Sequence, residues 1–159
     1  MQWLAYDTRN CSIQRTLDVI GEKWTPLILR ETFNGVRRFD QIRDHVGISD
    51  AVLADRLRKL VAAGVLETTP YQDQGRRARN EYRLTPKGLD LYPTMIALLK
   101  WGDTYCADPA GPSIIVTHHD CGAPVEAVVR CTAGHILESA RDGSPTSGPG
   151  ARELTVETP

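Results

Sequence analysis

The sequence lacks any long apolar run. None of its apolar stretches approaches the ~20 residues that a helix needs to cross a bilayer. The N-terminal residues MQWLAYDTRNCS also lack the basic and apolar regions of a secretory signal. These two absences predict a cytoplasmic protein. Only four cysteines are present, and in the cytoplasm we expect them to be reduced.

The chain also lacks a net basic charge, which alone would argue against a nucleic-acid-binding protein. Its formal net charge is −1 at pH 7. The charge is unevenly distributed, however. Residues 37–88 carry 11 basic and 7 acidic side chains, a net charge of +4, whereas residues 103–159 carry 3 basic and 8 acidic, a net charge of −5. Because local charge sets the attraction for phosphate, residues 37–88 are the candidate nucleic-acid contact.

Residues 38–64 are predicted to form two short helices joined by a tight turn. Gly47 can take a positive φ and end the first helix, and Ser49 can accept a hydrogen bond from the first N–H groups of the second. This is the layout of a helix-turn-helix, which an ordinary helical hairpin would share. Apolar residues recur here at gaps of three and four, which predicts one buried face on each helix: Ile42, Val46, Ile48, Leu53, Leu57, Leu60 and Val61.

A β-hairpin is predicted directly after these helices. Val65–Thr69 is rich in β-branched residues and Glu81–Thr85 alternates polar with apolar, so both read as strands. A hairpin in this place is the wing of a winged helix, and the arginines at its tip can reach phosphates or a narrow minor groove. The second helix, at 49–63, and the wing, at 65–85, are the predicted DNA-binding elements. The residues predicted to contact DNA are Arg38, Ser49, Asp50, Ala51, Ala54, Arg58, Lys59, Arg76, Arg77 and Arg79.

The flanking helices carry more apolar residues than a lone surface helix needs. Ser12 is expected to be the N-cap of the first, and Thr25 the N-cap of the second, with Pro26 at its first helical position. A third starts at Thr85-Pro86 and runs to about Ala107, with a kink or break at Pro93. The apolar excess of the first and last helices fits a dimer in which they pack across a two-fold axis. Folding of each helix onto its own domain is the alternative.

The predicted fold class is α+β, mostly α. It comprises a winged helix-turn-helix with terminal dimerisation helices, at 1–107, and a small C-terminal β-rich appendage, at 108–159. In the appendage, 114–117 and 125–129 look like short strands. Residues 143–150, GSPTSGPG, look like loop, and the last residues form a flexible tail.

Several motifs, in order and at consistent spacing over residues 9–105, resemble the HxlR-type winged helix-turn-helix regulators, relatives of the MarR group. They are Cys11, Gly21–Thr25, Arg38-Phe39, Gly47–Ser49, the Leu53/Leu57/Leu60 ladder, Gly64–Leu66 and Glu81–Gly88. The resemblance implies a homodimeric bacterial transcription factor that binds palindromic operator DNA. It also implies a recognition helix in the major groove, a wing on the backbone or minor groove, and dimer contacts from the first and last helices.

Two departures from the family pattern change what we expect of the DNA contacts. Arg76–Arg79 stand where the wing commonly has a proline before its second strand. Asp50, at the start of the recognition helix, would repel phosphate but can accept a hydrogen bond from a cytosine amino group. We therefore expect much of the phosphate attraction to come from the wing, while the recognition helix sets register and base choice.

Cys11 matches the position at which some relatives carry a redox-sensing cysteine. A helix N-terminus favours the thiolate, so an intersubunit disulfide or an electrophile adduct could shift the dimer geometry. The alternative is a small buried side chain without redox function. A small-molecule effector is a further expectation.

A second group of side chains could bind zinc in the appendage. Residues 118–122 read H-x-x-C-G, a variant of the zinc-ribbon knuckle, and residues 131–135 add one cysteine and one histidine. Four such ligands would close a tetrahedral shell, so a structural role is expected rather than a catalytic one. The alternative is a ribbon held by packing alone. The candidate ligands are His118, Cys121, Cys131 and His135, with His119 able to replace His118.

Two other classes of function compete with DNA binding. A winged helix can serve as a protein-interaction module, with the acidic appendage as its docking surface. Such a module has no need for basic residues on both the recognition helix and the wing. A small metalloenzyme would need three ligands and a nearby general base, which the His/Cys group does not supply. The sequence therefore predicts a non-enzymatic, DNA-binding regulator.

Overall fold

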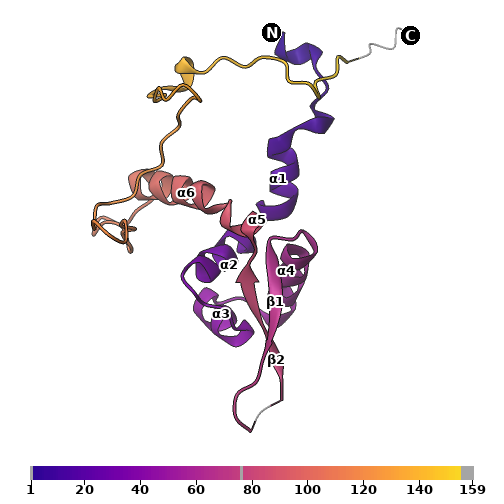
Figure 1. The fold of residues 1–159 in the computed structure, drawn as a ribbon, viewed down its shortest axis with the longest axis vertical. Helices are drawn as coiled ribbons and strands as arrows, with labels where there is room; N and C mark the ends of the chain where they lie inside the picture. The colour runs from indigo at the N-terminus through magenta and orange to yellow at the C-terminus, as the bar shows by residue number, and fades with distance from the viewer. Residues whose placement is uncertain (1, 76, 155–159) are drawn as a thin grey trace. The chain divides into compact units, whose positions relative to one another are not determined.

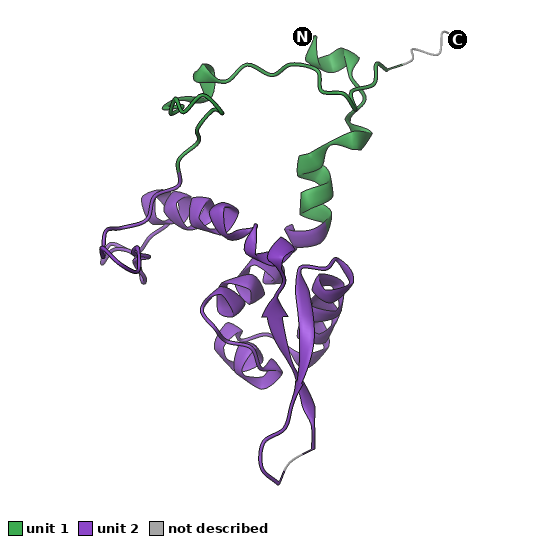
Figure 2. Cartoon of the chain, in the orientation of Figure 1, with its two compact units in different colours: residues 1–18, 128–159 green, residues 19–127 purple. Residues whose placement is uncertain are grey.

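The computed structural model describes residues 2–75 and 77–154 of the chain. It contains two compact units, Met1–Asp18 with Val128–Pro159, and Val19–Ala127 (Figure 2). The predicted boundary after residue 107 stays a prediction. The longer unit holds the elements of interest in the order α2 (Trp24–Phe33), α3 (Phe39–Val46), α4 (Asp50–Ala62), β1 (Leu66–Tyr71), β2 (Arg79–Leu84), α5 (Pro86–Leu89) and α6 (Tyr92–Tyr105) (Figure 1).

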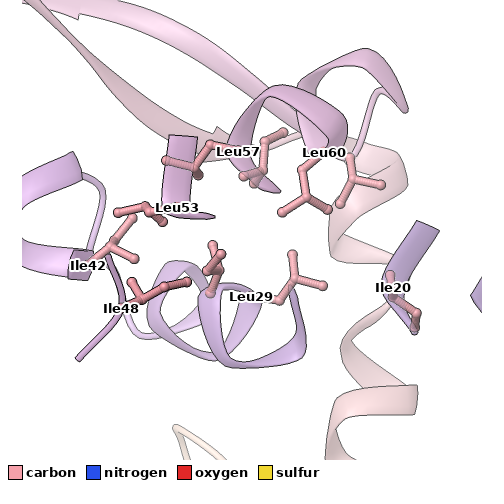
Figure 3. Close-up of a cluster of buried hydrophobic side chains, with 10 residues drawn as sticks. Ile20, Leu29, Ile42, Ile48, Leu53, Leu57 and Leu60 are labelled. Carbon is pink, nitrogen blue, oxygen red and sulfur yellow. The ribbon is translucent and has the colours of Figure 1, made fainter. Parts of the chain in front are cut away.

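The hydrophobic core lies between α2, α3 and α4, and β1 adds to it. Figure 3 shows leucine and isoleucine side chains from these helices pointing toward one another. The predicted apolar stripe is confirmed at Ile42, Ile48, Leu53, Leu57 and Leu60, which are all buried. Val46 and Val61 pack at its edge and are only partly buried. The core therefore fixes which face of α4 is turned outward.

The turn between α3 and α4 forms as predicted at Gly47. Its φ is 70°, and the N–H groups of Gly47 and Ile48 both donate to the Arg43 carbonyl, at 2.9 and 3.2 Å. These bonds satisfy the Arg43 carbonyl, one of those that the end of α3 would leave free. Ser49 does occupy the N-cap of α4, but its side chain makes no capping hydrogen bond. The predicted Ser49 cap is thus correct in position and wrong in its side-chain contact.

The wing is an antiparallel hairpin of β1 and β2. Its register pairs Leu66 with Leu84 at the base and Tyr71 with Arg79 toward the tip. The two leucines at the base face the core, while Arg79 is exposed. The hairpin is therefore anchored at one end and presents polar side chains at the other.

Helix starts differ from the predicted ones by a residue or two. Cys11, not Ser12, precedes α1 (Ser12–Ile20), because the Cys11 carbonyl accepts the bond from Arg15 N. Likewise Lys23, not Thr25, occupies the cap of α2. Ends of helices are their least predictable part. The predicted break near Pro93 is confirmed: α5 ends at Leu89, and Pro93 lies in the first turn of α6.

The strands expected at 114–117 and 125–129 do not form ladders. Within residues 108–154, the pairing consists of isolated bridges, among them Thr117 with Pro124 and Arg130 with Ile136. Short β-branched runs need a partner strand on a packed face to become a ladder, and most of this segment is exposed. The flexible tail predicted for the last residues falls mainly on 155–159, outside the described residues.

In the other unit, the N-terminal arm pairs with the C-terminal segment. Tyr6 forms an antiparallel bridge with Glu153, Asp7 N donates to Arg152 O at 2.8 Å, and Leu154 N donates to Ala5 O at 2.8 Å. Asn10 adds a side-chain bond to the Gly150 carbonyl. Among the described residues, no helix is both long enough and apolar enough to cross a membrane.

Candidate nucleic-acid interface

One face of α4 is exposed and carries two small side chains, those of Ala51 and Ala54. The face opposite to the buried leucines exposes the residues predicted to contact DNA: Ser49, Asp50, Ala51, Ala54, Arg58 and Lys59. Small residues at Ala51 and Ala54 let the helix backbone come close to a surface laid against it. A helix with such a face fits the B-DNA major groove, which is about 12 Å wide.

Two exposed cations of α4, Arg58 and Lys59, share one carboxylate. Lys59 Nζ lies 3.0 Å from Asp55 Oδ2, and Arg58 forms an ion pair with the same side chain. The hydrogen bond from Lys59 and the charges of its basic neighbours hold the pKa of Asp55 below its usual value. Asp55 therefore stays ionised near neutral pH and offsets part of the attraction that this helix has for phosphate.

Asp50 is the first residue of α4. It accepts a hydrogen bond from Arg43, a residue that was not among the predicted site residues. Arg43 Nη1 donates to Asp50 Oδ1 at 3.3 Å, and Arg43 Nε donates to Asp44 at 2.7 Å. The hydrogen bonds to Asp44 and then Asp50 raise the pKa of Arg43. The signal was present in the sequence: a basic residue in the last turn of the first helix faces the start of the second.

Arg38 joins the start of α3 to the wing. Its Nη1 and Nη2 atoms donate to the two carboxylate oxygens of Asp73 at 3.2 and 3.1 Å, and its guanidinium lies 4.4 Å from the centroid of the Tyr71 ring. A bidentate pair of this kind fixes orientation as well as distance. The geometry thus ties Arg38 to the wing in the free protein, and its direct contact with DNA stays a prediction.

A double-mutant cycle on Arg38 and Asp73 separates these two roles. If the pair positions the wing, Arg38→Ala and Asp73→Ala should each weaken DNA binding about threefold, and the double variant should be no weaker than either, because exposed pairs contribute about 0.5–1 kcal/mol. Fluorescence anisotropy would measure this. Glu67→Ala, which removes one wing carboxylate that is not in the pair, is the control. A stronger-binding Asp73→Ala protein would instead make Arg38 a direct phosphate contact.

The wing tip carries unpaired positive charge. Arg77 and Arg79 are exposed, and neither forms an ion pair or a side-chain hydrogen bond with another described residue. Arg76, predicted to act with them, lies outside the described residues. Arg83, farther down β2, is paired with Glu81 (Nε to Oε1, 2.7 Å). The free cations of the wing are therefore gathered toward its tip.

Cys11 is a half-buried free thiol at the start of α1. It lines a cavity of about 380 Å³ formed by the N-terminal arm and residues 146–151. The other three cysteines are also free. The structure therefore confirms that Cys11 stands at a helix N-terminus, as the redox hypothesis requires.

The predicted zinc ligands form two local pairs. Cys121 N donates to His118 Nδ1 at 3.4 Å in a turn closed by Gly122, whose φ is 70°. Cys131 Sγ lies 3.5 Å from His135 Nδ1. The first pair belongs to Val19–Ala127 and the second to the other unit. Over residues 2–75 and 77–154, no three His, Cys, Asp or Glu side chains are placed to hold a metal ion.

Two helices expose large apolar side chains in the part of the chain that the structure describes. On α6, Leu98, Trp101 and Tyr105 are exposed, and the Trp101 and Tyr105 rings lie 5.4 Å apart. On α1, Ile13 and Leu17 are exposed. Contiguous apolar residues of this size on a surface mark an interaction site.

Comparison with known proteins agrees with this geometry. Over 139 residues the chain is 43% identical to Rv3095, an uncharacterized HTH-type transcriptional regulator of Mycobacterium tuberculosis, with 87% of each chain covered. Among solved structures, PA1607, a candidate transcription factor, matches with a TM-score of 0.77 and 36% identity over 88% of this chain and 96% of that one.

A more distant match is the redox regulator HypR in its reduced form. Its TM-score is 0.52 at 29% identity, and the match covers 58% of this chain and 90% of HypR. Residues 19–109 match the HxlR-like helix-turn-helix family. The matched range runs from the end of α1 past α6 and includes the helix-turn-helix and the wing. The chain therefore belongs to the HxlR-like helix-turn-helix family of transcriptional regulators, which are not enzymes.

Proposed function

We propose that the protein is a cytoplasmic homodimer that binds palindromic operator DNA, with α4 in the major groove and the wing on the backbone or in the minor groove. The observation that carries the proposal is the joint exposure of the outer face of α4 and of the unpaired Arg77 and Arg79 at the wing tip. The helix and the hairpin would supply different contacts. Contacts of α4 with base edges would give sequence specificity, and contacts of the wing with phosphates would fix the position of the protein on the duplex.

The dimer is supported by the exposed apolar side chains of α1 and α6. Burial of about 25 cal/mol per Å² of apolar surface favours their association with a second copy. A two-fold dimer presents two copies of α4, so its operator should have two inverted half-sites. The paired surfaces are the same on both chains in such an interface.

Sedimentation velocity with a labelled duplex tests the proposal. Alone, the protein should sediment as a species of twice the chain mass of 17.6 kDa, and at low salt it should bind DNA with two chains per complex. A species of single-chain mass that leaves the duplex free would contradict both parts of the proposal.

We further propose that Cys11 responds to an oxidant. Support comes from its place at the start of α1 and from the similarity to HypR, a redox regulator. Oxidation by diamide should form a disulfide that includes Cys11 and change DNA affinity several-fold, and Cys11→Ser should remove the change. Mass spectrometry of the treated protein identifies the product. Cys106→Ser is the matched control, and an unmodified Cys11 would end the hypothesis.

Structural zinc in the appendage also remains a proposal, with His118, Cys121, Cys131 and His135 as its ligands. Support comes from the local pairs: a separation of 3.5 Å between Cys131 Sγ and His135 Nδ1 suits two ligands of one tetrahedral ion, with metal bonds of about 2.3 Å to sulfur and 2.0–2.1 Å to nitrogen. Elemental analysis of untagged protein should find one zinc per chain, which Cys131→Ser should remove. Metal-free wild-type protein would rule the site out.

A further inference from the structure

A largely apolar cavity lies between two helices of the DNA-binding unit. It has a volume of about 540 Å³, and its walls come from α2, from α6 and from residues 114–116. Both helices can be followed in Figure 1. The apolar lining includes Leu27 and Phe33 of α2, and Met95, Ile96 and Leu99 of α6.

The size and shape of the cavity suit a small molecule. Ligand pockets in proteins have volumes of about 300–1,000 Å³ and combine an apolar lining with few polar groups. Here residues Ile114, Ile115 and Val116 form a third wall beside the two helices. A flat helix-docking face would lack such a wall, so the occupant should be smaller than a protein element.

Two polar side chains of the lining, Arg30 and Asn34, lie at the C-terminal end of α2, and the Tyr92 hydroxyl of α6 is a third polar group. Arg30 and Asn34 lie one turn apart there, and the Asn34 amide donates to the Arg30 carbonyl at 2.8 Å. The Arg30 side chain is 42% exposed, and its Nε and Nη2 atoms are bound by Glu31. A guanidinium has five N–H donors in a planar fork, so Arg30 has donor capacity left for a second anionic group.

We propose that this cavity binds a small amphipathic anion, with its apolar body between α2 and α6 and its acidic group on Arg30. The charge of Arg30 selects the acidic group, and the aromatic and aliphatic lining selects the body. The proposal rests on the proposed function only for its consequence, which is regulation of DNA binding.

The consequence follows from the contacts of Glu31. This carboxylate is 2% exposed, and its two oxygens are divided between Arg30 Nε, at 2.8 Å, and His45 Nδ1 of α3, at 2.6 Å. An acidic ligand on the remaining N–H groups of Arg30 competes with Glu31 for the guanidinium charge, so the buried Glu31 depends more on His45. Because an unpaired buried carboxylate is costly, ligand binding shifts the position of α3, the first helix of the helix-turn-helix.

Two related dyes test the site without DNA. 8-anilinonaphthalene-1-sulfonate has an apolar body and a sulfonate, and N-phenyl-1-naphthylamine has the same body without the charge. Both should bind with enhanced fluorescence, one per chain. Leu98→Trp, which fills the cavity from its rim, should weaken both dyes at least tenfold. Leu89→Trp, at an equally exposed leucine outside the cavity lining, should weaken neither.

Arg30→Gln separates charge recognition from apolar binding. It should weaken the sulfonate dye about tenfold, as expected for loss of a charged hydrogen bond, and change the neutral dye less than about twofold. Arg30→Lys, which keeps the charge, should restore most of the sulfonate affinity and covers the case in which Arg30→Gln unfolds. Equal binding of both dyes to Leu98→Trp and wild type, or equal loss of both in Arg30→Gln, would overturn the proposal.

The DNA measurement is kept separate from the dye measurement. If the dyes bind as described and DNA does not, the cavity stands and the proposed function fails. If the protein binds DNA and neither dye, the proposed function stands and the cavity proposal fails. With both in place, the sulfonate dye should change DNA affinity in the wild type and much less in Arg30→Gln.

Discussion

Replacement of both Arg77 and Arg79 by alanine is expected to weaken DNA binding about 100-fold at near-physiological salt. In a dimer the double substitution removes four phosphate contacts, and each contact releases about one counterion. The plot of log K against log salt concentration should therefore become shallower by about 3.6. Fluorescence anisotropy at several salt concentrations measures both quantities.

The matched control for charge is Arg130→Ala with Arg141→Ala. It removes the same charge from exposed residues outside α4 and the wing, and should change the slope little. An unchanged slope in the wing variant, or an equal change in the control, would contradict the assignment of the wing as the main phosphate contact. The sequence also predicts a DNA contact for Arg76. Adding Arg76→Ala to the wing variant should therefore weaken DNA binding further and make the salt dependence shallower still.

Gly88→Ala is expected to destabilise the fold by about 2 kcal/mol. A methyl group at Gly88 would meet the backbone carbonyl oxygen of Val65 well inside contact distance and lie 3.0 Å from Leu84 Cδ2. Val65 is buried, and its carbonyl accepts bonds from Thr85 N and Thr85 Oγ1. Overpacking against backbone that cannot yield commonly costs about 1–3 kcal/mol.

Gly102→Ala is the matched control, since Gly102 is also helical and has open space at its Cβ position. Alanine is a better helix former than glycine by about 0.8–1.0 kcal/mol, so this variant should be at least as stable as the wild type. Urea unfolding followed by circular dichroism gives both values. A Gly88→Ala protein as stable as Gly102→Ala would show that the wing base and α5 can separate at little cost.

The main elements could be predicted from the sequence because they depend on local chemistry and periodicity. The leucine ladder of α4 fixes its buried face, Gly47 ends α3 with a positive φ, and Thr85 caps α5 through a bond from Gly88 N. Each of these needs only neighbours close in sequence. The wing was also predicted from local pattern, as two strand-like runs directly after the second helix, and β1 and β2 confirm it. The family resemblance is confirmed over residues 19–109.

What could not be predicted depends on contacts between distant residues. Nothing in the spacing of Arg38 and Asp73, which are 35 residues apart, indicates that they pair. The same is true of Glu31 with His45, and of the cavity between α2 and α6. Residues 114–117 have the β-branched pattern of a strand, but the segment is largely exposed and pairs only through the isolated bridge of Thr117 with Pro124.

Ion pairs reduce the free positive charge on the surface predicted to contact DNA, which the amino-acid composition does not show. Asp55 holds Arg58 and Lys59, and Asp73 holds Arg38, so the free protein presents fewer unpaired cations than its sequence suggests. The pairing lowers the nonspecific attraction to phosphate, while Arg77 and Arg79 at the wing tip stay exposed. A regulator that must leave wrong sites quickly benefits from such pairing, because nonspecific binding is mainly electrostatic.

Selection of bound sequences from a random pool of DNA tests the central claim most directly. The wild-type protein should enrich an inverted repeat whose half-site centres lie about 10 base pairs apart or at a multiple of that spacing. Its half-sites should keep their sequence when the pool is bound by the Arg77 and Arg79 variant at lower salt, since the wing adds affinity and α4 sets base choice. Failure to enrich any sequence, or enrichment of a single unpaired site, would contradict a homodimer that reads DNA through α4.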